Sequence, residues 1–300
     1  MINYDNIINK INDFKLSIDS LYIEENKSLK RILDYNKLHE LRSCSKILVA
    51  MAMGIAIENN LFSLDEKVYN YLEKYINNKN NVSKIKQWTI KTLLTHTTGY
   101  DKMLMSNKEI NEKNLDKEKL LDYVLNYDIV NEPNTTYIYN NVEPFIISVL
   151  FKEKHNIDLE RYIKENIFDR IEIQNYDWEK YGKYCPGCTG LYLLPKDFHK
   201  LGMLFLNSGI YNSVPIVPSD WINEMVKLQI KTPNLVKTER LFPKYGAGYF
   251  TFISRDGYVF RDGPNGQYII INKNKNLLIS IMSSEKDMSK ITEIFRDNIN

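Results

Sequence analysis

A serine and a lysine three residues apart can carry out acyl transfer, because that spacing on a helix places both side chains on one face. The lysine amine can accept the proton of the serine hydroxyl if burial and the positive end of the helix dipole lower the pKa of the amine. The pattern occurs at Ser43–Lys46, Ser83–Lys86 and Ser283–Lys286. The pattern alone therefore does not identify a nucleophile.

The surroundings separate these three pairs. Only Ser43 leads directly into a continuous apolar segment, residues 47–57, which predicts a helix that is buried on every side. Ser83 lies among Asn, Lys and Gln, and Ser283 follows a predicted strand, so both are most simply surface or capping residues. For Ser43, the alternative interpretation is an N-cap serine beside a solvated Lys46.

A phenol could complete such a site. Tyrosine has a pKa near 10 and becomes a usable base only beside a cation, which Lys46 would supply. Residues i and i+2 of an extended segment point the same way, so Tyr139 and Asn141 could both face a cleft. Tyr4-Asp5-Asn6 and Tyr75-Ile76-Asn77 fit the same Tyr-x-Asn pattern, so this motif is also weak alone.

The elements that must position these residues follow from the hydrophobic periodicity. We expect a helix over 1–14 and strands over 16–23 and 29–33, and then a mostly helical region to about residue 230. Its helices are predicted at 47–59, from a capping box at Ser63 toward Tyr75, and at 116–126, 142–154, 158–167, 196–207 and 219–229. Strands are predicted at 248–253, 258–261, 267–272 and 277–282, and a last helix at 286–297. The fold class is therefore α/β (α+β), with one antiparallel sheet built from both termini, flanked by helices, and a helical subdomain inserted between them.

Composition argues against several classes of function and location. The 40 basic and 38 acidic residues are interspersed, which argues against a nucleic-acid partner. The longest apolar run is much shorter than the roughly 20 residues of a spanning helix. The polar N-terminus does not fit a secretory signal and three cysteines suit a reducing compartment, so a cytoplasmic location is expected unless a leader was removed.

No metal or cofactor is expected from the sequence. The four histidines have no metal-ligand spacing, and no phosphate-binding or dinucleotide-binding loop is present. Cys185 and Cys188 have the spacing of a redox pair, but no βαβ pattern surrounds them. Redox or metal chemistry at these cysteines is therefore the less favoured interpretation.

Five segments, taken in order, resemble the motif blocks of the serine β-lactamase-like superfamily. This superfamily includes class C β-lactamases, penicillin-binding DD-peptidases, related esterases and the 6-aminohexanoate-dimer hydrolase branch. The segments are 38–72, TIKTLLTHTTGY (89–100), TTYIYNNVEPFIISVL (135–150), 187–225 and 245–281. The resemblance implies a single β-lactamase-like catalytic domain over 1–300, with an α/β part of 1–40 and 240–300 and a helical part of 41–239.

The resemblance also implies roles for individual residues. Ser43 corresponds to the nucleophile, Lys46 to its base, Tyr139 to the proton relay, and Asn141 to a residue that binds the acyl-side carbonyl or amide of the substrate. The third motif is ordinarily Lys or His, any residue, and then Gly on a strand that faces the nucleophile.

The third motif maps onto Pro264-Asn265-Gly266. Gly266 would let the substrate lie against the strand, and the N–H of Gln267 with that of Ser43 would form the oxyanion hole. Pro264 supplies neither a charge nor a donor, which predicts a changed substrate preference.

The predicted function is that of a serine hydrolase which cleaves an ester or amide bond through an acyl-enzyme on Ser43, without metal or cofactor. Its expected partner is a small ester, amide or peptide-like molecule. A β-lactamase and a penicillin-binding DD-peptidase are alternatives within the same chemistry. A catalytically silent binding or sensor protein is an alternative from another class, and Pro264 motivates it.

Overall fold

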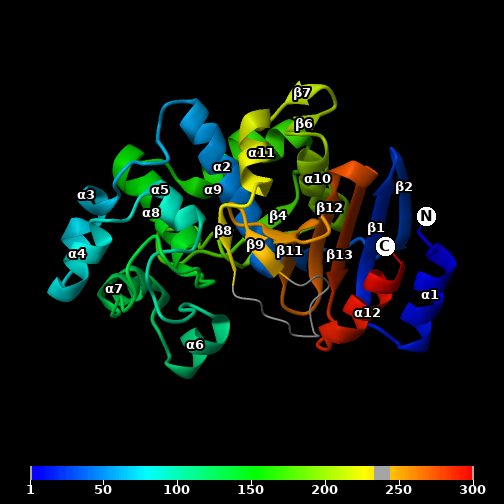
Figure 1. Ribbon diagram of the computed structural model, residues 1–300, viewed down its shortest axis with the longest axis horizontal. Coiled ribbons are helices and arrows are strands. Elements are labelled where there is room, and N and C mark those ends of the chain that lie inside the picture. The colour runs from blue at the N-terminus through cyan, green and yellow to red at the C-terminus, as the bar shows by residue number, and fades with distance from the viewer. Residues whose placement is uncertain (1, 233–243, 299–300) are drawn as a thin grey trace.

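The computed structural model describes residues 2–232 and 244–298, and an antiparallel sheet forms its centre (Figure 1). Within these residues the sheet has eight strands in the order β2-β1-β13-β12-β11-β10-β9-β8. The strands are β1 (Ile18–Glu25), β2 (Ser28–Asp34), β8 (Ile230–Lys231), β9 (Lys244–Ala247), β10 (Phe252–Ser254), β11 (Val259–Gly263), β12 (Gln267–Asn272) and β13 (Leu277–Ser283). Strand β1 pairs with β13, with Leu21 opposite Ile281. The prediction of an antiparallel sheet built from both ends of the chain is confirmed.

The central strands are apolar almost throughout because both faces of the sheet are covered. On β12, Tyr268 and Ile270 belong to one apolar layer, and Ile269 and Ile271 belong to the other. Helices α1 (Tyr4–Asp13) and α12 (Met288–Asn298) cover the first layer and lie next to each other. Helix α10 (Pro195–Leu206) packs on β12 and β13 from the other side, in the layer that also contains α2 (Lys46–Glu58).

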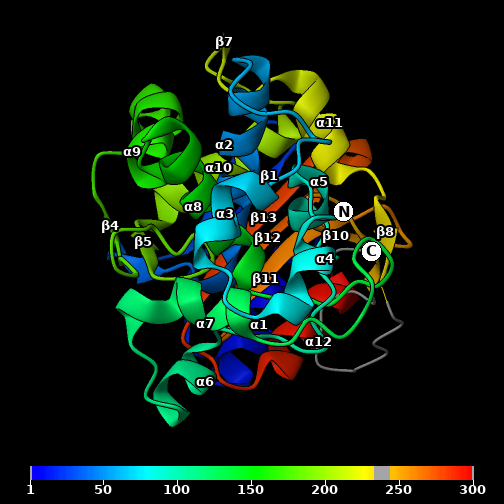
Figure 2. The ribbon, with the colours of Figure 1, turned by 90° about the vertical axis from the view of Figure 1, so that its left-hand side faces the viewer.

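The helical part of the chain lies to one side of the sheet, away from α1 and α12 (Figures 1 and 2). Besides α2 and α10, it contains α3 (Tyr69–Leu72), α4 (Val82–Ile85), α5 (Ile90–Leu94), α6 (Asn107–Glu112), α7 (Leu120–Asn126), α8 (Val142–His155), α9 (Leu159–Ile163) and α11 (Ser219–Val226). Strands β3 (His39–Glu40), β5 (Leu191–Leu193) and β4 (Tyr176–Trp178) form a small second sheet, and β6 (Ile210–Tyr211) pairs with β7 (Val214–Pro215). In the described part of the chain, every helix is too short or too polar to cross a membrane.

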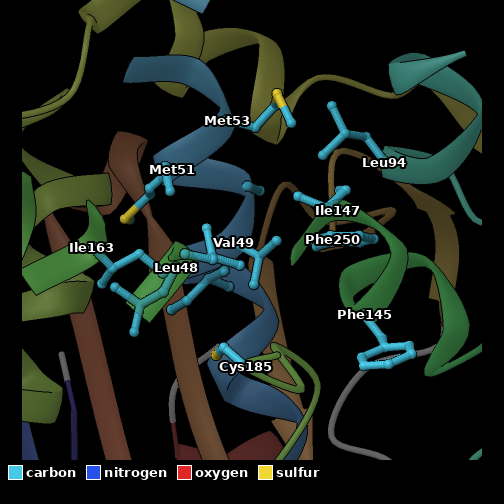
Figure 3. Close-up of a cluster of buried hydrophobic side chains, with 14 of the residues drawn as sticks. Leu48, Val49, Met51, Met53, Leu94, Phe145, Ile147, Ile163, Cys185 and Phe250 are labelled. Atoms are coloured by element: carbon cyan, nitrogen blue, oxygen red, sulfur yellow. The ribbon is translucent and has the colours of Figure 1, made fainter. Parts of the chain in front are cut away.

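Helix α2 runs through the middle of the core, and every side chain from Lys46 to Ala56 is buried. Figure 3 shows Leu48, Val49 and Met51 among apolar side chains from several other segments. Gly54 permits a close approach of α11, because a Cβ at this position would lie only 2.0 Å from the indole of Trp221. The Trp221 Nε1 donates a hydrogen bond of 2.8 Å to the carbonyl of Ala50. This packing fixes the position of the helix end that carries Lys46.

The structure corrects the helix that the sequence predicts from Ser63. The Glu66 side chain does accept a hydrogen bond from the Ser63 N–H, as a capping box requires. However, Lys67 pairs with Thr89 in a β-bridge, which holds the segment extended. The helix begins only at Tyr69 and has a single turn.

The structure also corrects the strand predicted over 248–253. Strand β9 ends at Ala247, the Gly248 N–H bonds to the carbonyl of Thr251, and β10 begins at Phe252. A turn therefore divides what reads as one apolar strand in the sequence. The predicted boundary at 239/240 between the helical part and the α/β part lies outside the described residues, and the division stays a prediction.

Candidate active site

The segment just before α2 forms a 3₁₀ turn, η1 (Arg42–Ser45), that lies against β11. Arg42 has a φ of +51°, a conformation that residues other than glycine rarely adopt. Ser45, not Ser43, directly precedes α2, and no side chain caps the helix. Ser43 remains partly exposed while Cys44 and Ser45 are buried. The N-cap interpretation of Ser43 is therefore not supported.

The amine of Lys46 is fully buried at the start of α2 and is surrounded by oxygen atoms. Its Nζ lies 3.2 Å from Ser43 Oγ, 2.9 Å from the Tyr139 hydroxyl, 2.7 Å from Asn141 Oδ1 and 3.3 Å from the Cys188 carbonyl. An ammonium group has three protons, so it cannot fully satisfy four acceptors at once. No acidic side chain of the described residues forms an ion pair with this amine.

The Tyr-x-Asn segment is held in place by Asn140, the residue between the two predicted site residues. Its Oδ1 accepts from the N–H groups of Leu104 and Asn141, and its Nδ2 donates to the carbonyl of Lys102. Tyr139 and Asn141 consequently both reach Lys46. The Asn141 amide is also bonded to the Met105 carbonyl through Nδ2 at 2.9 Å, so both ends of this amide already have partners within the protein.

The phenol of Tyr139 lies between two cations. Its hydroxyl oxygen accepts from Lys46 and also from Arg261 Nη2 at 2.8 Å. Burial raises the pKa of the phenol, but the charges of Arg261 and Lys46, with hydrogen bonds to Lys46 and Ser43, lower the pKa below its ordinary value. The phenolate is therefore accessible nearer to neutral pH than in a free tyrosine.

The recorded contacts of Gly266 and of the Gln267 side chain are with α12, β13 and the turn at 264–265, and not with the nucleophile. A Cβ on Gly266 would lie 2.6 Å from Ile291 Cδ1 and 3.1 Å from Ser283, so this glycine faces α12 and β13. The Gln267 side chain donates to the Ser283 carbonyl. Within the described residues, no hydrogen bond joins Gly266 or Gln267 to Ser43. The mapping of the third motif onto Pro264-Asn265-Gly266 is not supported, because these residues form the turn beyond the end of β11.

Strand β11 faces the nucleophile three residues earlier, at Arg261-Asp262-Gly263. A Cβ on Gly263 would lie 3.2 Å from the Ser43 nitrogen and 2.9 Å from Arg42 Cβ. Arg261, two residues before this glycine and thus on the same face of the strand, donates from Nε to the Ser43 carbonyl at 3.0 Å. Sequence reasoning missed Arg261. The sequence did contain a signal for it. The first position of the third motif is ordinarily basic, which fits Arg261 two residues before Gly263 and does not fit Pro264 two residues before Gly266.

Comparison with known proteins identifies the family. Residues 25–294 match the family profile described as Beta-lactamase. The chain belongs to the beta-lactamase family. Penicillin-binding protein 4* of Bacillus subtilis (strain 168) is 23% identical in an alignment 198 residues long, which covers 60% of this chain and 42% of that protein. The aligned part thus spans less than half of this relative.

Two solved structures share the fold. A candidate beta-lactamase from Bacteroides dorei DSM 17855 superposes with a TM-score of 0.79 at 15% identity, and covers 100% of both chains. A candidate 6-aminohexanoate-dimer hydrolase from Bacillus anthracis superposes with a TM-score of 0.75 at 17% identity, and covers 97% of this chain and 80% of that chain. At these identities the likeness concerns the beta-lactamase fold alone.

A second buried polar group of this beta-lactamase family member, formed by His96, Glu143 and Thr98, packs against the Tyr139 ring. His96 Nδ1 lies 2.8 Å from Glu143 Oε2, and Thr98 Oγ1 donates to Glu143 Oε1 at 2.7 Å. The His96 ring lies 5.2 Å from the Tyr139 ring, and the His96 carbonyl accepts from the Ile138 N–H. Burial lowers the pKa of His96, although Glu143 acts in the opposite direction. His96 is therefore a buried residue that is hydrogen-bonded to Glu143.

The three cysteines are free thiols and are all buried. Burial raises the pKa of each, to about 11 for Cys188. Of these cysteines, Cys188 contacts Lys46, and it does so through its backbone carbonyl. Among residues 2–232 and 244–298, no group of three or more His, Cys, Asp or Glu side chains could hold a metal ion.

Proposed function

We propose that this protein is a serine hydrolase that cleaves an ester or amide bond through an acyl-enzyme on Ser43. One observation carries the proposal. The amine of Lys46 is within hydrogen-bond distance of both the Ser43 hydroxyl and the Tyr139 hydroxyl. A nucleophile in contact with a base that a third group orients is the arrangement used in covalent catalysis.

The reaction proceeds in two steps. Ser43 Oγ bonds to the carbonyl carbon of the substrate while its proton passes to the Lys46–Tyr139 pair, and the leaving alcohol or amine departs with that proton. Water then gives a proton to the same pair and bonds to the acyl carbon, and Ser43 Oγ leaves with the proton. In this proposal the Ser43 N–H stabilises the oxyanion of both steps.

Small esters and amides, including peptide-like ones, are the proposed substrates. Family membership supports the reaction class, and the structural neighbour from Bacillus anthracis bears the name of a 6-aminohexanoate-dimer hydrolase. β-Lactam hydrolysis and DD-peptidase activity are particular cases of the same acyl transfer, and the Bacillus subtilis relative is named as a penicillin-binding protein. The cytoplasmic location stays a prediction from composition.

Intact-mass spectrometry tests the proposal. The protein is mixed with a panel of acyl donors that contains a short-chain chromogenic ester, a peptide-like amide and nitrocefin. We expect a mass increase equal to the acyl group, together with release of the leaving group, and both should be lost in Ser43→Ala. Ser83→Ala is the matched control, because Ser83 belongs to another Ser-x-x-Lys pair and lies exposed on α4. Retention of the adduct in Ser43→Ala would contradict the proposal.

A binding protein without turnover is the second candidate, and one observation favours it. Gly263 lies against the Ser43 nitrogen, and the next peptide nitrogen belongs to Pro264, which has no hydrogen to donate. The end of β11 therefore offers one oxyanion donor fewer beside Ser43 than a chain without proline would.

Pro264→Ala distinguishes the two candidates. It supplies an N–H, and one oxyanion donor is worth about 10²–10³-fold in other enzymes. Detectable turnover by the wild-type protein supports the hydrolase, and Pro264→Ala should then raise the rate of acylation. If the wild-type protein neither turns over nor labels and only Pro264→Ala is acylated, the wild-type protein is the binding module.

A further inference from the structure

The loop that precedes α6 reaches the candidate active site through one backbone carbonyl. The Asn141 Nδ2 donates to the carbonyl oxygen of Met105 at 2.9 Å, while the Oδ1 of the same amide accepts from Lys46 at 2.7 Å. The Lys46 amine lies 3.2 Å from the Ser43 hydroxyl, so a single residue separates Asn141 from the nucleophile. An acyl group bonded to Ser43 therefore lies close to this amide, and Met105 has already taken one of its donors.

The Met105 carbonyl is held in place by the backbone on either side of it. The Met105 N–H donates to Glu109 Oε2 at 2.7 Å, and the N–H of Leu104 donates to Asn140 Oδ1 at 2.9 Å. Leu104 and Met105 are both fully buried. Met105 has a φ of +57°, a left-handed conformation that costs free energy in a residue other than glycine. A strained residue persists only where its surroundings hold it, and here they hold its carbonyl against Asn141.

Glu109 fixes this backbone although it does not touch the site itself. Its Oε1 accepts from Lys113 Nζ and from the Tyr123 hydroxyl, each at 2.8 Å, and its Oε2 accepts from Met105. Hydrogen bonds to an ionised acceptor are stronger than those between neutral groups. The position of the Met105 carbonyl is therefore set by a carboxylate on α6.

We propose that the Met105 carbonyl is a specificity-determining group and that Glu109 is the positioning residue behind it. The carbonyl occupies the place beside Asn141 Nδ2 where an amide carbonyl of a substrate would accept a hydrogen bond. It also fixes the orientation of the Asn141 amide, with its oxygen toward Lys46. This inference rests on the proposed function and names its substrate class: acyl donors whose acyl group is a hydrocarbon chain, without an amide next to the scissile carbonyl.

Exposure explains why the other N–H of this amide does not serve a substrate instead. A side-chain amide has two N–H groups, and Met105 accepts from one of them. Asn141 is only 7% exposed, which leaves little surface through which a ligand reaches the other. Displacing the Met105 carbonyl leaves a buried acceptor without a partner. An acyl group that carries an amide must therefore break one hydrogen bond to make one, and gains no affinity here.

The first test observes the Asn141 amide directly and does not depend on activity. Its side-chain resonances are assigned in a ¹H–¹⁵N spectrum by their absence in Asn141→Asp, and their hydrogen exchange is measured. In the wild-type protein we expect slow exchange of the N–H that is bonded to Met105. Glu109→Ala removes the acceptor of the Met105 N–H and should speed this exchange at least tenfold. Glu109→Gln keeps an acceptor oxygen and should speed it less.

The second test measures acyl-group preference with butylboronic acid and acetamidomethylboronic acid, which have chains of equal length. In both cases Ser43 Oγ bonds to boron while its proton passes to the Lys46–Tyr139 pair, so binding is measured without turnover. Each affinity is corrected for the affinity of that boronic acid for hydroxide. We expect the wild-type protein to bind the acetamido compound no more tightly than the butyl compound. Glu109→Ala should raise the relative affinity for the acetamido compound about fivefold, the value of one hydrogen bond.

Glu112→Ala is the matched control, because it removes a glutamate of the same helix that pairs with Lys108 at the surface. It should change neither the exchange nor the ratio of affinities. A wild-type preference of fivefold or more for the acetamido compound would overturn the inference, and so would slow exchange that persists in a folded Glu109→Ala protein. If neither boronic acid binds the wild-type protein, the proposed function fails, while the exchange measurement still decides whether Glu109 holds Met105 against Asn141.

Discussion

Two buried polar groups lie next to each other in this protein, and their charges are compensated differently. In the His96–Glu143 pair, an imidazole faces a carboxylate at 2.8 Å. In the two-cation cluster, Lys46 and Arg261 share the phenol oxygen of Tyr139, and no carboxylate of the described residues joins them. An imidazole paired with a carboxylate is compensated and can serve structure alone. Cations that share an ionisable phenol perturb its pKa, which is typical of a site that moves protons.

Among the substitutions that test this difference, Lys46→Met should have the largest effect on the acylation rate. It removes the amine that contacts both the nucleophile and the phenol, so we expect the rate of Ser43 acylation to fall toward the upper end of the range of about 10²–10⁴-fold for proton-transfer groups. Methionine fills most of the same volume, so the fold should persist. The measurement is the acylation rate by mass spectrometry, with Lys86→Met as control. A wild-type rate in Lys46→Met would remove Lys46 from the mechanism.

Tyr139→Phe breaks the two-cation cluster from the other side. It leaves both Lys46 and Arg261 without their shared acceptor, so we expect a fall in acylation of about 10²–10³-fold and a lower free energy of unfolding as well. Tyr137→Phe is the matched control, because the Tyr137 hydroxyl is buried and has no hydrogen-bond partner in the described part of the chain. If the two variants acylate at the same rate, the Tyr139 phenol transfers no proton during acylation.

Glu143→Gln addresses the compensated pair. If His96 donates from Nδ1 to Glu143, the amide nitrogen of glutamine would meet a donor, or the amide would have to turn and lose the bond from Thr98. We therefore expect a loss of about 1–3 kcal/mol in the free energy of unfolding. The acylation rate should change by less than tenfold. A collapse of activity at unchanged stability would place this pair in the chemistry and remove the distinction between the two groups.

The sequence was informative wherever burial is complete. The apolar run after Lys46 predicts a helix buried on every side, and α2 is that helix. The strands near the C-terminus read as nearly continuous apolar segments because helices cover both faces of the sheet. The same logic singled out Ser43 among three equivalent motifs, since only this serine precedes a fully buried helix. The structure brings Ser43, Lys46, Tyr139 and Asn141 together.

The third motif could not be placed from the sequence because its position depends on where a strand ends. Gly263 and Gly266 both close a three-residue pattern, and only the end of β11 at Gly263 decides which one faces Ser43. The partners of Asn141 were equally inaccessible, because Met105 reaches its amide through a loop whose path the sequence does not specify. Packing between distant segments sets both features, and local propensity does not report it.

The smallest expected effect concerns the other buried imidazole of the described residues, that of His199, which no carboxylate of these residues contacts at hydrogen-bond distance. His199 Nδ1 bonds to Ser280 Oγ at 2.8 Å, and its Nε2 is 3.9 Å from Glu24 Oε2. Burial, with a contribution from Arg31, lowers the pKa of His199 to about 4. Because this is below the unfolded value near 6.5, the unfolded chain binds the proton first, and stability is lost as the pH falls from about 6.5 toward 4.

His199→Gln should remove that acid sensitivity. At about 1.4 kcal/mol for each pH unit, the wild-type protein should lose about 2 kcal/mol more than the variant between pH 7 and pH 5, as measured by urea denaturation. His96 also has a lowered pKa and stays in both proteins, so its contribution cancels in the difference. Equal slopes for the two proteins would mean that His199 finds a proton acceptor in the native state, as His96 does in Glu143. His96 and His199 would then both be imidazoles with a compensating partner. The two-cation cluster would remain the buried group without a carboxylate among the described residues.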